Sequence, residues 1–233
     1  MSSNTRFAVF AIMALAAAFG GRAPLFPAEV EQSPPQTVCG GKLAPAGGSV
    51  EPQPIHYTVD NSQDARTLTG LENKGPNQRV LGRTVTKFKT ATTFKMNNVR
   101  LADGRLCVSP FITVQVALDP ITVYVASEYP PGSCEERIIL EHEQRHLAVS
   151  ERQLTHLART LQADLQGLFA DGMLIADDIG AAVNLVTQKS REAIRARIAA
   201  ARAQSASLQA QVDSTEEITR LSDLLRVCAP PKP

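Results

Sequence analysis

The chain has 233 residues, 43% of them hydrophobic, which is enough for one domain with an apolar core. Its 24 basic and 23 acidic side chains leave a formal net charge of +1, which argues against nucleic acid as a partner, because such binding needs a strongly basic surface. Helix-forming residues are frequent beyond residue 150, so we expect the C-terminal third to be mostly helical.

The N-terminus has the pattern of an export signal. Arg6 supplies a positive charge, and residues 7–19 form an apolar run that is shorter than the roughly 20 residues needed to span a bilayer. We therefore expect residues 1–20 to be a signal peptide and the protein to be exported, as a periplasmic or secreted protein with no stable membrane span after cleavage. A short uncleaved membrane anchor is the alternative.

After the predicted signal peptide, the composition of the chain changes near residue 55 from proline- and glycine-rich to strand-forming. Residues 21–54 carry seven of the fifteen prolines and several glycines, which predicts a flexible lead-in. Beyond it, residues 55–60 and 83–96 have strand patterns, and a short helix is predicted within 62–77. The lead-in is thus expected to precede a region that begins with β-structure.

Two further β-rich runs, 106–118 and 121–127, flank Asp119-Pro120, and we interpret them as the strands of a hairpin. Asp-Pro is not among the favoured two-residue turns, so a longer loop that shifts the strand register is the alternative.

The four cysteines are even in number, which in an exported chain suggests two disulfides. The predicted hairpin would place Cys107 opposite a position close to Cys134. We therefore expect one disulfide between Cys107 and Cys134 and a second between Cys39 and Cys228.

Two long helices are predicted to follow. The first covers about 134–169, with Ser133 as its N-cap and with Glu135 and Glu136 in the first turn, where the helix dipole favours negative charge. The second covers about 181–227, where apolar and small residues alternate three and four apart. The two helices should form an antiparallel helical hairpin.

These elements together predict an α+β fold, in which a small antiparallel β-sheet with a short helix is followed by the long helical hairpin. Residues 55–227 would form this domain, and 228–233 would be a short tail.

His142 and His146 form the pattern His-Glu-x-x-His on the first predicted helix. Residues four apart differ by about 40° around a helix, so both imidazoles can reach one zinc ion. Glu143 is rotated by about 100° from His142, which suits a catalytic general base that takes a proton from water activated by zinc. Arg145 departs from the usual pattern, which holds uncharged residues there, and a charged helix with incidental histidines is the alternative.

A catalytic zinc site needs a third protein ligand, which the first helix does not supply. His156 would lie about 21 Å along the helix from His142, and Glu151 points to the opposite face. No glycine between His146 and Gly167 breaks the helix, so a later histidine cannot return to the site.

The second helix, running back along the first, should come level with the motif between residues 208 and 220. Glu216 is the first choice as third ligand, because it lies only about 80° from the apolar seam of that helix. Asp213 is the second choice, and His56 is a more remote candidate. These acids can equally belong to a solvated face.

Several stretches share one layout: "IHYTV" from residue 55, "LTGLENKGP" from residue 68, the Cys-x-Val stretch at Cys107, and "PPGSCEERIILEHEQRHLAVSE" from residue 130. This layout resembles that of a family of uncharacterised bacterial secreted proteins predicted to be zinc-dependent proteases, up to about residue 220. The resemblance implies a zincin-like site, with the two histidines of the motif as ligands and the glutamate as catalyst.

In that family an aspartate late in the second helix is followed by a histidine-glycine pair. Here Asp213 is present, but Ile218 stands where the histidine would be expected. Either Glu216 takes its place or the site lacks a ligand.

Three functions fit the sequence. The first is an exported zinc-dependent peptidase acting on a peptide or protein substrate, with Zn²⁺ as cofactor and Glu143 as general base. The second is a non-catalytic envelope-binding or scaffold protein, whose histidines are incidental or hold structural zinc. The third is a zinc-dependent hydrolase acting on a non-peptide envelope substrate. A structural site is closed by four protein ligands, so the ligand count discriminates.

Overall fold

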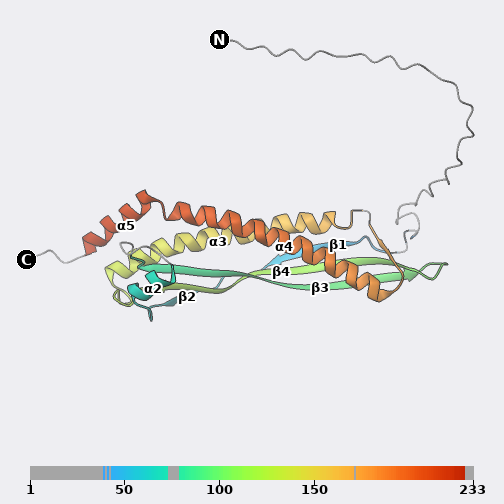
Figure 1. Ribbon diagram of the computed structural model, residues 1–233, viewed down its shortest axis with the longest axis horizontal. Helices are drawn as coiled ribbons and strands as arrows, with labels where there is room; N and C mark the ends of the chain where they lie inside the picture. The colour runs from blue at the N-terminus through green and yellow to red at the C-terminus, as the bar shows by residue number, and fades with distance from the viewer. Residues whose placement is uncertain (1–38, 40, 42, 73–78, 171, 229–233) are drawn as a thin grey trace, which may run out of the picture. The chain divides into compact units, whose positions relative to one another are not determined.

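The computed structural model describes residues 39, 41, 43–72, 79–170 and 172–228. The predicted signal peptide and residues 229–233 of the predicted tail lie outside the described residues. No helix in the described ranges combines the length and apolar character needed to cross a bilayer. The elements in chain order are β1 (Gly47–Pro52), β2 (Thr58–Asp60), α2 (Ala65–Leu71), β3 (Gly82–Arg100), β4 (Leu106–Val125), α3 (Cys134–Gly167), β5 (Leu174–Ala176), α4 (Ile179–Val212) and α5 (Thr215–Cys228) (Figure 1).

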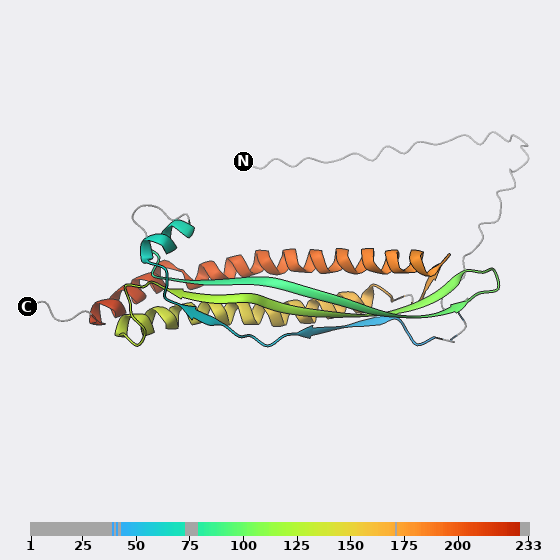
Figure 2. The same cartoon turned by 90° about the horizontal axis from the view of Figure 1, so that it is seen from below.

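Strand β4 is the centre of the sheet, since each of the other strands in the described residues pairs with it. β3 runs antiparallel to β4 from Gly82, opposite Val125, to Arg100, opposite Leu106, and so occupies one whole edge of β4. β5, β1 and β2 pair with successive parts of the other edge, β5 antiparallel and the other two parallel (Figure 2). Among the described strands, none pairs with the outer edge of β3.

The predicted hairpin at Asp119-Pro120 is wrong. β4 runs through these residues as one strand of 20 residues, and the turn lies earlier, at residues 101–105, where Gly104 has φ 90°. The register with β3 shifts between Thr86 and Phe88, so Asp119-Pro120 forms a bulge on β4. A bulge tolerates proline because its extra residue makes no regular ladder hydrogen bond.

The predicted fold class, a small antiparallel β-sheet followed by a helical hairpin, is also wrong. β1 and β2 are parallel to β4, and β1 lies inside the segment 21–54 that was predicted to be a flexible lead-in. Two glycines and a proline in β1 disfavour a strand, and pairing with the buried strand β4 outweighs this local preference. Between the two long helices the chain returns to the sheet as β5, and the second predicted helix is divided into α4 and α5.

Helix α3 is fixed over one face of the sheet by an apolar stripe. Its N-cap is the predicted one: Ser133 Oγ accepts a 3.1 Å hydrogen bond from the N–H of Glu136. Burial of a Leu, Ile or Val side chain contributes about 2 kcal/mol, so the stripe and the facing side of β4 hold the two elements together. Their shared core includes Ile112, Val114, Val116, Leu118, Ile121, Leu147, Leu154, Leu161 and Leu165.

Helix α4 packs along α3 in the opposite direction, on the same side of the sheet (Figure 1). Val186 and Ile194 of α4 belong to the same core as the apolar stripe of α3. Arg197 forms an ion pair with Asp164, near the end of α3. The later part of α4 is thereby directed toward the first turns of α3.

Both disulfides differ from the predicted pairs. Cys39 is bonded to Cys107, and Cys134 to Cys228, with Cα–Cα distances of 5.9 Å and 5.6 Å. The predicted Cys107–Cys134 bond depended on the false hairpin. Cys107 lies near the start of β4 and Cys134 follows its end, and at about 3.3 Å per strand residue these ends are about 60 Å apart.

Peptide mapping without reduction tests this connectivity. Digestion of the oxidised protein with a glutamate-specific protease, which cleaves after Glu128 and so separates Cys107 from Cys134, should release one disulfide-linked peptide pair containing Cys39 and Cys107 and another containing Cys134 and Cys228, because only these pairs are close enough to bond. Mass spectrometry identifies the pairs. Detection of a Cys107–Cys134 pair as the main product would contradict the continuous strand β4.

Candidate metal centre

Two imidazoles and one carboxylate converge between α3 and the end of α4. His142 and His146 lie on α3, and Asp213 is the C-cap residue of α4. Oδ1 of Asp213 is 3.3 Å from Nε2 of His142 and 3.1 Å from Nε2 of His146, and the two Nε2 atoms are 3.3 Å apart. Within the described residues, these three side chains form the one group suited to hold a metal ion.

The triangle of ligand atoms has the dimensions of a tetrahedral zinc site. Ligands at about 2.0–2.1 Å from a zinc ion lie about 3.3 Å from one another in tetrahedral geometry. The observed separations of 3.1–3.3 Å match this value. The residues present therefore fit zinc, with a fourth position left for water or substrate.

The structure brings together both predicted histidine ligands and the second-choice acid, but not Glu216. Glu216 is exposed in the first turn of α5, and His56 is also exposed; neither belongs to the group. In a single straight helix over 181–227, as predicted, Asp213 would point away from the apolar seam that faces the first helix. The helix ends at Val212, and the backbone of Asp213, with φ −92° and ψ 27°, breaks the helical register.

Glu143 is held in a buried position between α3 and the start of β3. Its side chain is almost fully enclosed, with 3% of the residue exposed. Thr84 Oγ1 donates a 2.8 Å hydrogen bond to Oε2 of Glu143. Burial raises the pKa of the Glu143 carboxyl, while the charge of His146 and the hydrogen bond from Thr84 act in the opposite direction. Thr84 has no recognisable sequence signal and was not predicted.

The charges of the ligand group favour a bound cation. Hydrogen bonds to His142 and then to His146 hold the pKa of Asp213 well below its usual range, so its carboxylate is ionised. Burial lowers the pKa of His146, but hydrogen bonds to Asp213 and Gln209 outweigh it, so the net shift is upward. An ionised carboxylate beside two imidazoles is a donor set that zinc prefers.

The two histidines differ in what their second ring nitrogen contacts. Nδ1 of His146 is 2.6 Å from Oε1 of Gln209. Nδ1 of His142 is buried and has no hydrogen-bond partner among the described residues. A metal-ligating histidine usually donates from its second nitrogen, which fixes the ring, so His146 is the better-oriented ligand.

A groove with a volume of about 1190 Å³ opens beside the ligand group. One wall is the start of β3, residues 82–88, and the other is formed by α4 and α5; His142, Glu143 and His146 line it from α3. β3 also lies close to Glu143 at Gly82, where an added Cβ atom would be 2.6 Å from Oε1 of Glu143. Glycine at this position therefore leaves the space that the Glu143 carboxylate occupies.

Arg145, the charged residue inside the motif, is used in ion pairs between helices. It pairs with Glu141 one turn earlier at 2.9 Å and with Glu217 of α5. Its charge thus connects α3 to α5, and this accounts for the departure from the uncharged pattern.

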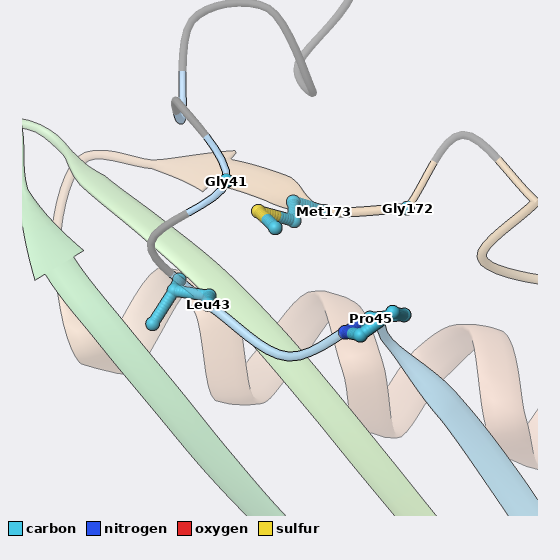
Figure 3. Close-up of a pocket in the computed structure, with 5 residues that line it drawn as sticks. All are labelled: Gly41, Leu43, Pro45, Gly172 and Met173. Carbon is cyan, nitrogen blue, oxygen red and sulfur yellow. The ribbon is translucent and has the colours of Figure 1, made fainter.

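A smaller pocket lies toward the other end of β4. It has a volume of about 290 Å³ (Figure 3). Its lining comes from the segment before β1 and from the residues just before β5, and within the described part of the chain this lining has no ionisable side chain. The lining residues are Gly41, Leu43, Pro45, Gly172 and Met173. We therefore assign the chemistry to the groove beside α3.

Comparisons with family models, with curated proteins and with solved structures gave no match to this chain. The family resemblance inferred from the sequence stays a prediction, and the geometry of the site is the basis on which a function is proposed.

Substitution of Asp213 and of Glu216 tests which of these two acids is the third zinc ligand. Asp213→Ala should weaken zinc binding by more than about 100-fold, because changes in the outer shell alone cost about 10- to 100-fold. Glu216→Ala, its matched control, should leave the affinity unchanged. Competition with a chromophoric chelator measures both dissociation constants, and a loss of zinc in Glu216→Ala with retention in Asp213→Ala would reverse the assignment.

Proposed function

We propose that this protein is an exported zinc-dependent peptidase with Glu143 as its general base. One observation carries the proposal: Nε2 of His142, Nε2 of His146 and Oδ1 of Asp213 form a zinc-sized triangle in a groove that Glu143 also lines. A structural zinc site is closed by four protein ligands, and the described residues offer three. This ligand count favours a catalytic centre over the non-catalytic scaffold alternative.

The residues divide the work of hydrolysis. His142, His146 and Asp213 would hold zinc, which when bound supplies a Lewis acid that polarises a carbonyl and acidifies water. Glu143 would take the proton of the attacking water and pass it to the leaving amine. Its burial suits this role, since a raised pKa makes the carboxylate a stronger base toward the attacking water and lets it hold the proton until the amine leaves.

The unpaired edge of β3 supports an extended peptide as substrate. Residues 82–88 line the groove, and no strand of the described residues pairs with their outer edge. A peptide that adds to such an edge satisfies its backbone N–H and C=O groups through main-chain hydrogen bonds. A non-peptide ester would gain no comparable contacts, so the edge favours the peptidase over a hydrolase with another substrate.

Export is part of the proposal. The protein has two disulfides, Cys39–Cys107 and Cys134–Cys228. Structural disulfides persist in oxidising compartments and are rare in the cytosol. They support a periplasmic or secreted location, in agreement with the signal peptide predicted for residues 1–20.

Replacement of the general base tests the proposal. Glu143→Gln keeps the size of the side chain but cannot take a proton, so zinc should stay bound while hydrolysis falls by at least about 100-fold. Mass spectrometry of an incubated peptide library measures cleavage, and zinc content is measured on the same samples. If the zinc-loaded wild-type protein cleaves no peptide, or if Glu143→Gln cleaves as fast as wild type, the proposal fails.

Gly82 offers a second test, because it is not a candidate ligand. In Gly82→Ala the new Cβ would meet Oε1 of Glu143 at 2.6 Å and Cγ2 of Ile139 at 2.7 Å, so the carboxylate must move. A displacement of about 1 Å can cost about 100-fold in rate, and kcat/KM should fall by that order while zinc affinity is unchanged. Gly70→Ala is the control, since a Cβ there meets no atom within 4 Å. Full activity in Gly82→Ala would show that Glu143 need not occupy its observed position.

A further inference from the structure

Asp213 lies in a break between two helices, so regular helix geometry does not fix its carboxylate. α4 ends at Val212 and α5 begins at Thr215, and the Asp213 side chain is 45% exposed. Residues at helix ends lack part of the backbone hydrogen bonding that holds the interior of a helix. Contacts on either side of the break must therefore direct this side chain toward α3.

Gln209, four residues before Asp213, contacts α3 at the motif itself. Its Nε2 donates to the backbone oxygen of His146 at 3.0 Å and to Oγ of Ser150 at 3.1 Å. A backbone oxygen only accepts, so the amide orientation is fixed and Oε1 faces Nδ1 of His146 at 2.6 Å. Nδ1 therefore carries a proton that it donates to Oε1, which leaves Nε2 as the nitrogen that would bind the metal.

Glu217, four residues after Asp213, contacts the same region of α3. Its carboxylate forms an ion pair with Arg145, and its side chain is only 20% exposed. Arg220, one turn later on α5, approaches the same carboxylate at 2.7 Å and holds it from its own helix. The break that contains Asp213 is therefore attached to α3 both before and after the candidate ligand.

We propose that Gln209 and Glu217 are positioning residues that hold the α4–α5 break against α3 and so fix Asp213 beside the two histidines. Gln209 has a second role, since it sets the tautomer of His146. The inference rests on the zinc centre of the proposed function. It also assigns a purpose to Arg145, whose charge inside the motif pairs with Glu217.

Zinc affinity tests the positioning role. Gln209→Leu should raise the dissociation constant by about 10- to 100-fold, the usual cost of losing an outer-shell partner of a metal-bound histidine. Glu217→Gln should raise it by about fivefold, the effect expected for a partly exposed ion pair. Gln209→Glu keeps an acceptor for Nδ1 of His146 but loses the N–H groups that donate to the backbone oxygen of His146 and to Ser150, so its affinity should lie between those of wild type and the leucine variant. If Gln209 served only to join α4 to α3 through its N–H groups, the glutamate variant would be as weak as the leucine variant.

Two control variants change similar side chains nearby. Gln211→Leu alters an exposed glutamine two residues from Gln209, and Asp223→Asn removes the acid of an exposed ion pair with Arg226 on α5. Both should bind zinc as wild type does. All variants should unfold, in the presence of a chelator, at the temperature of the metal-free wild type.

Cobalt(II) in place of zinc gives a second readout, because its visible absorption reports the ligand set. The spectrum of Gln209→Leu should shift toward that of Asp213→Ala, since the Asp213 carboxylate is no longer held in position.

If wild type binds the metal and both Gln209→Leu and Glu217→Gln bind it equally well, the positioning role is overturned and the zinc centre stands. If the variants lose metal-free stability in parallel with affinity, their role is structural and the inference is also overturned. If wild type binds neither zinc nor cobalt, the proposed function fails with it.

Discussion

The contact of the Asp213 carboxylate with His142 and His146 is the interaction on which the site depends, and it exists because α4 returns along α3. Apolar residues of α4 share the core of the stripe that holds α3 on the sheet, which sets the spacing of the two helices. The antiparallel direction then brings a residue about 70 positions downstream level with the motif, as the contacts of 3.3 Å and 3.1 Å with sequence separations of 71 and 67 show. The candidate ligands thus come from two helices, whereas Glu143, the proposed general base, is held against the sheet by its hydrogen bond with Thr84.

The sheet could be predicted only in part, because its pairings are set by long-range contacts. The strand character of residues 83–96, 106–118 and 121–127 was readable from β-branched and alternating residues, and these runs fall largely within β3 and β4. The position of the turn was not readable: the Asp119-Pro120 pair predicts a turn inside what is one continuous strand, and β3 and β4 are connected through Asp103-Gly104, a favoured turn pair. The wrong position of the turn also led to the wrong predicted pairing for both disulfides. The parallel strand β1 had no local signal, since its pairing with β4 rather than its composition makes it a strand.

The candidate metal site, like the sheet, could be predicted from the sequence only in part. The spacing of His142, Glu143 and His146 fixes their faces on a helix, so this part was predicted from sequence. The choice between Asp213 and Glu216 depended on whether the second helix is continuous. Ser214 and Glu217 have the spacing of a capping box, and Ser214 Oγ accepts a 3.3 Å hydrogen bond from the N–H of Glu217, so the start of α5 has a sequence signal that the prediction of one long helix did not use. Residues that orient the site, such as Thr84, come from segments far apart in the chain and have no motif that could reveal them.

X-ray absorption at the zinc edge of the zinc-loaded wild-type protein tests the central claim most directly, because it reports the atoms bound to the metal. The account predicts two imidazole nitrogens and one carboxylate oxygen at about 2.0–2.2 Å, with the fourth position occupied by a light atom from water. The signal should lose its carboxylate contribution in Asp213→Ala. A site closed by a fourth protein ligand such as a third imidazole, or an ion bound without both histidines, would contradict a catalytic zinc centre at this position.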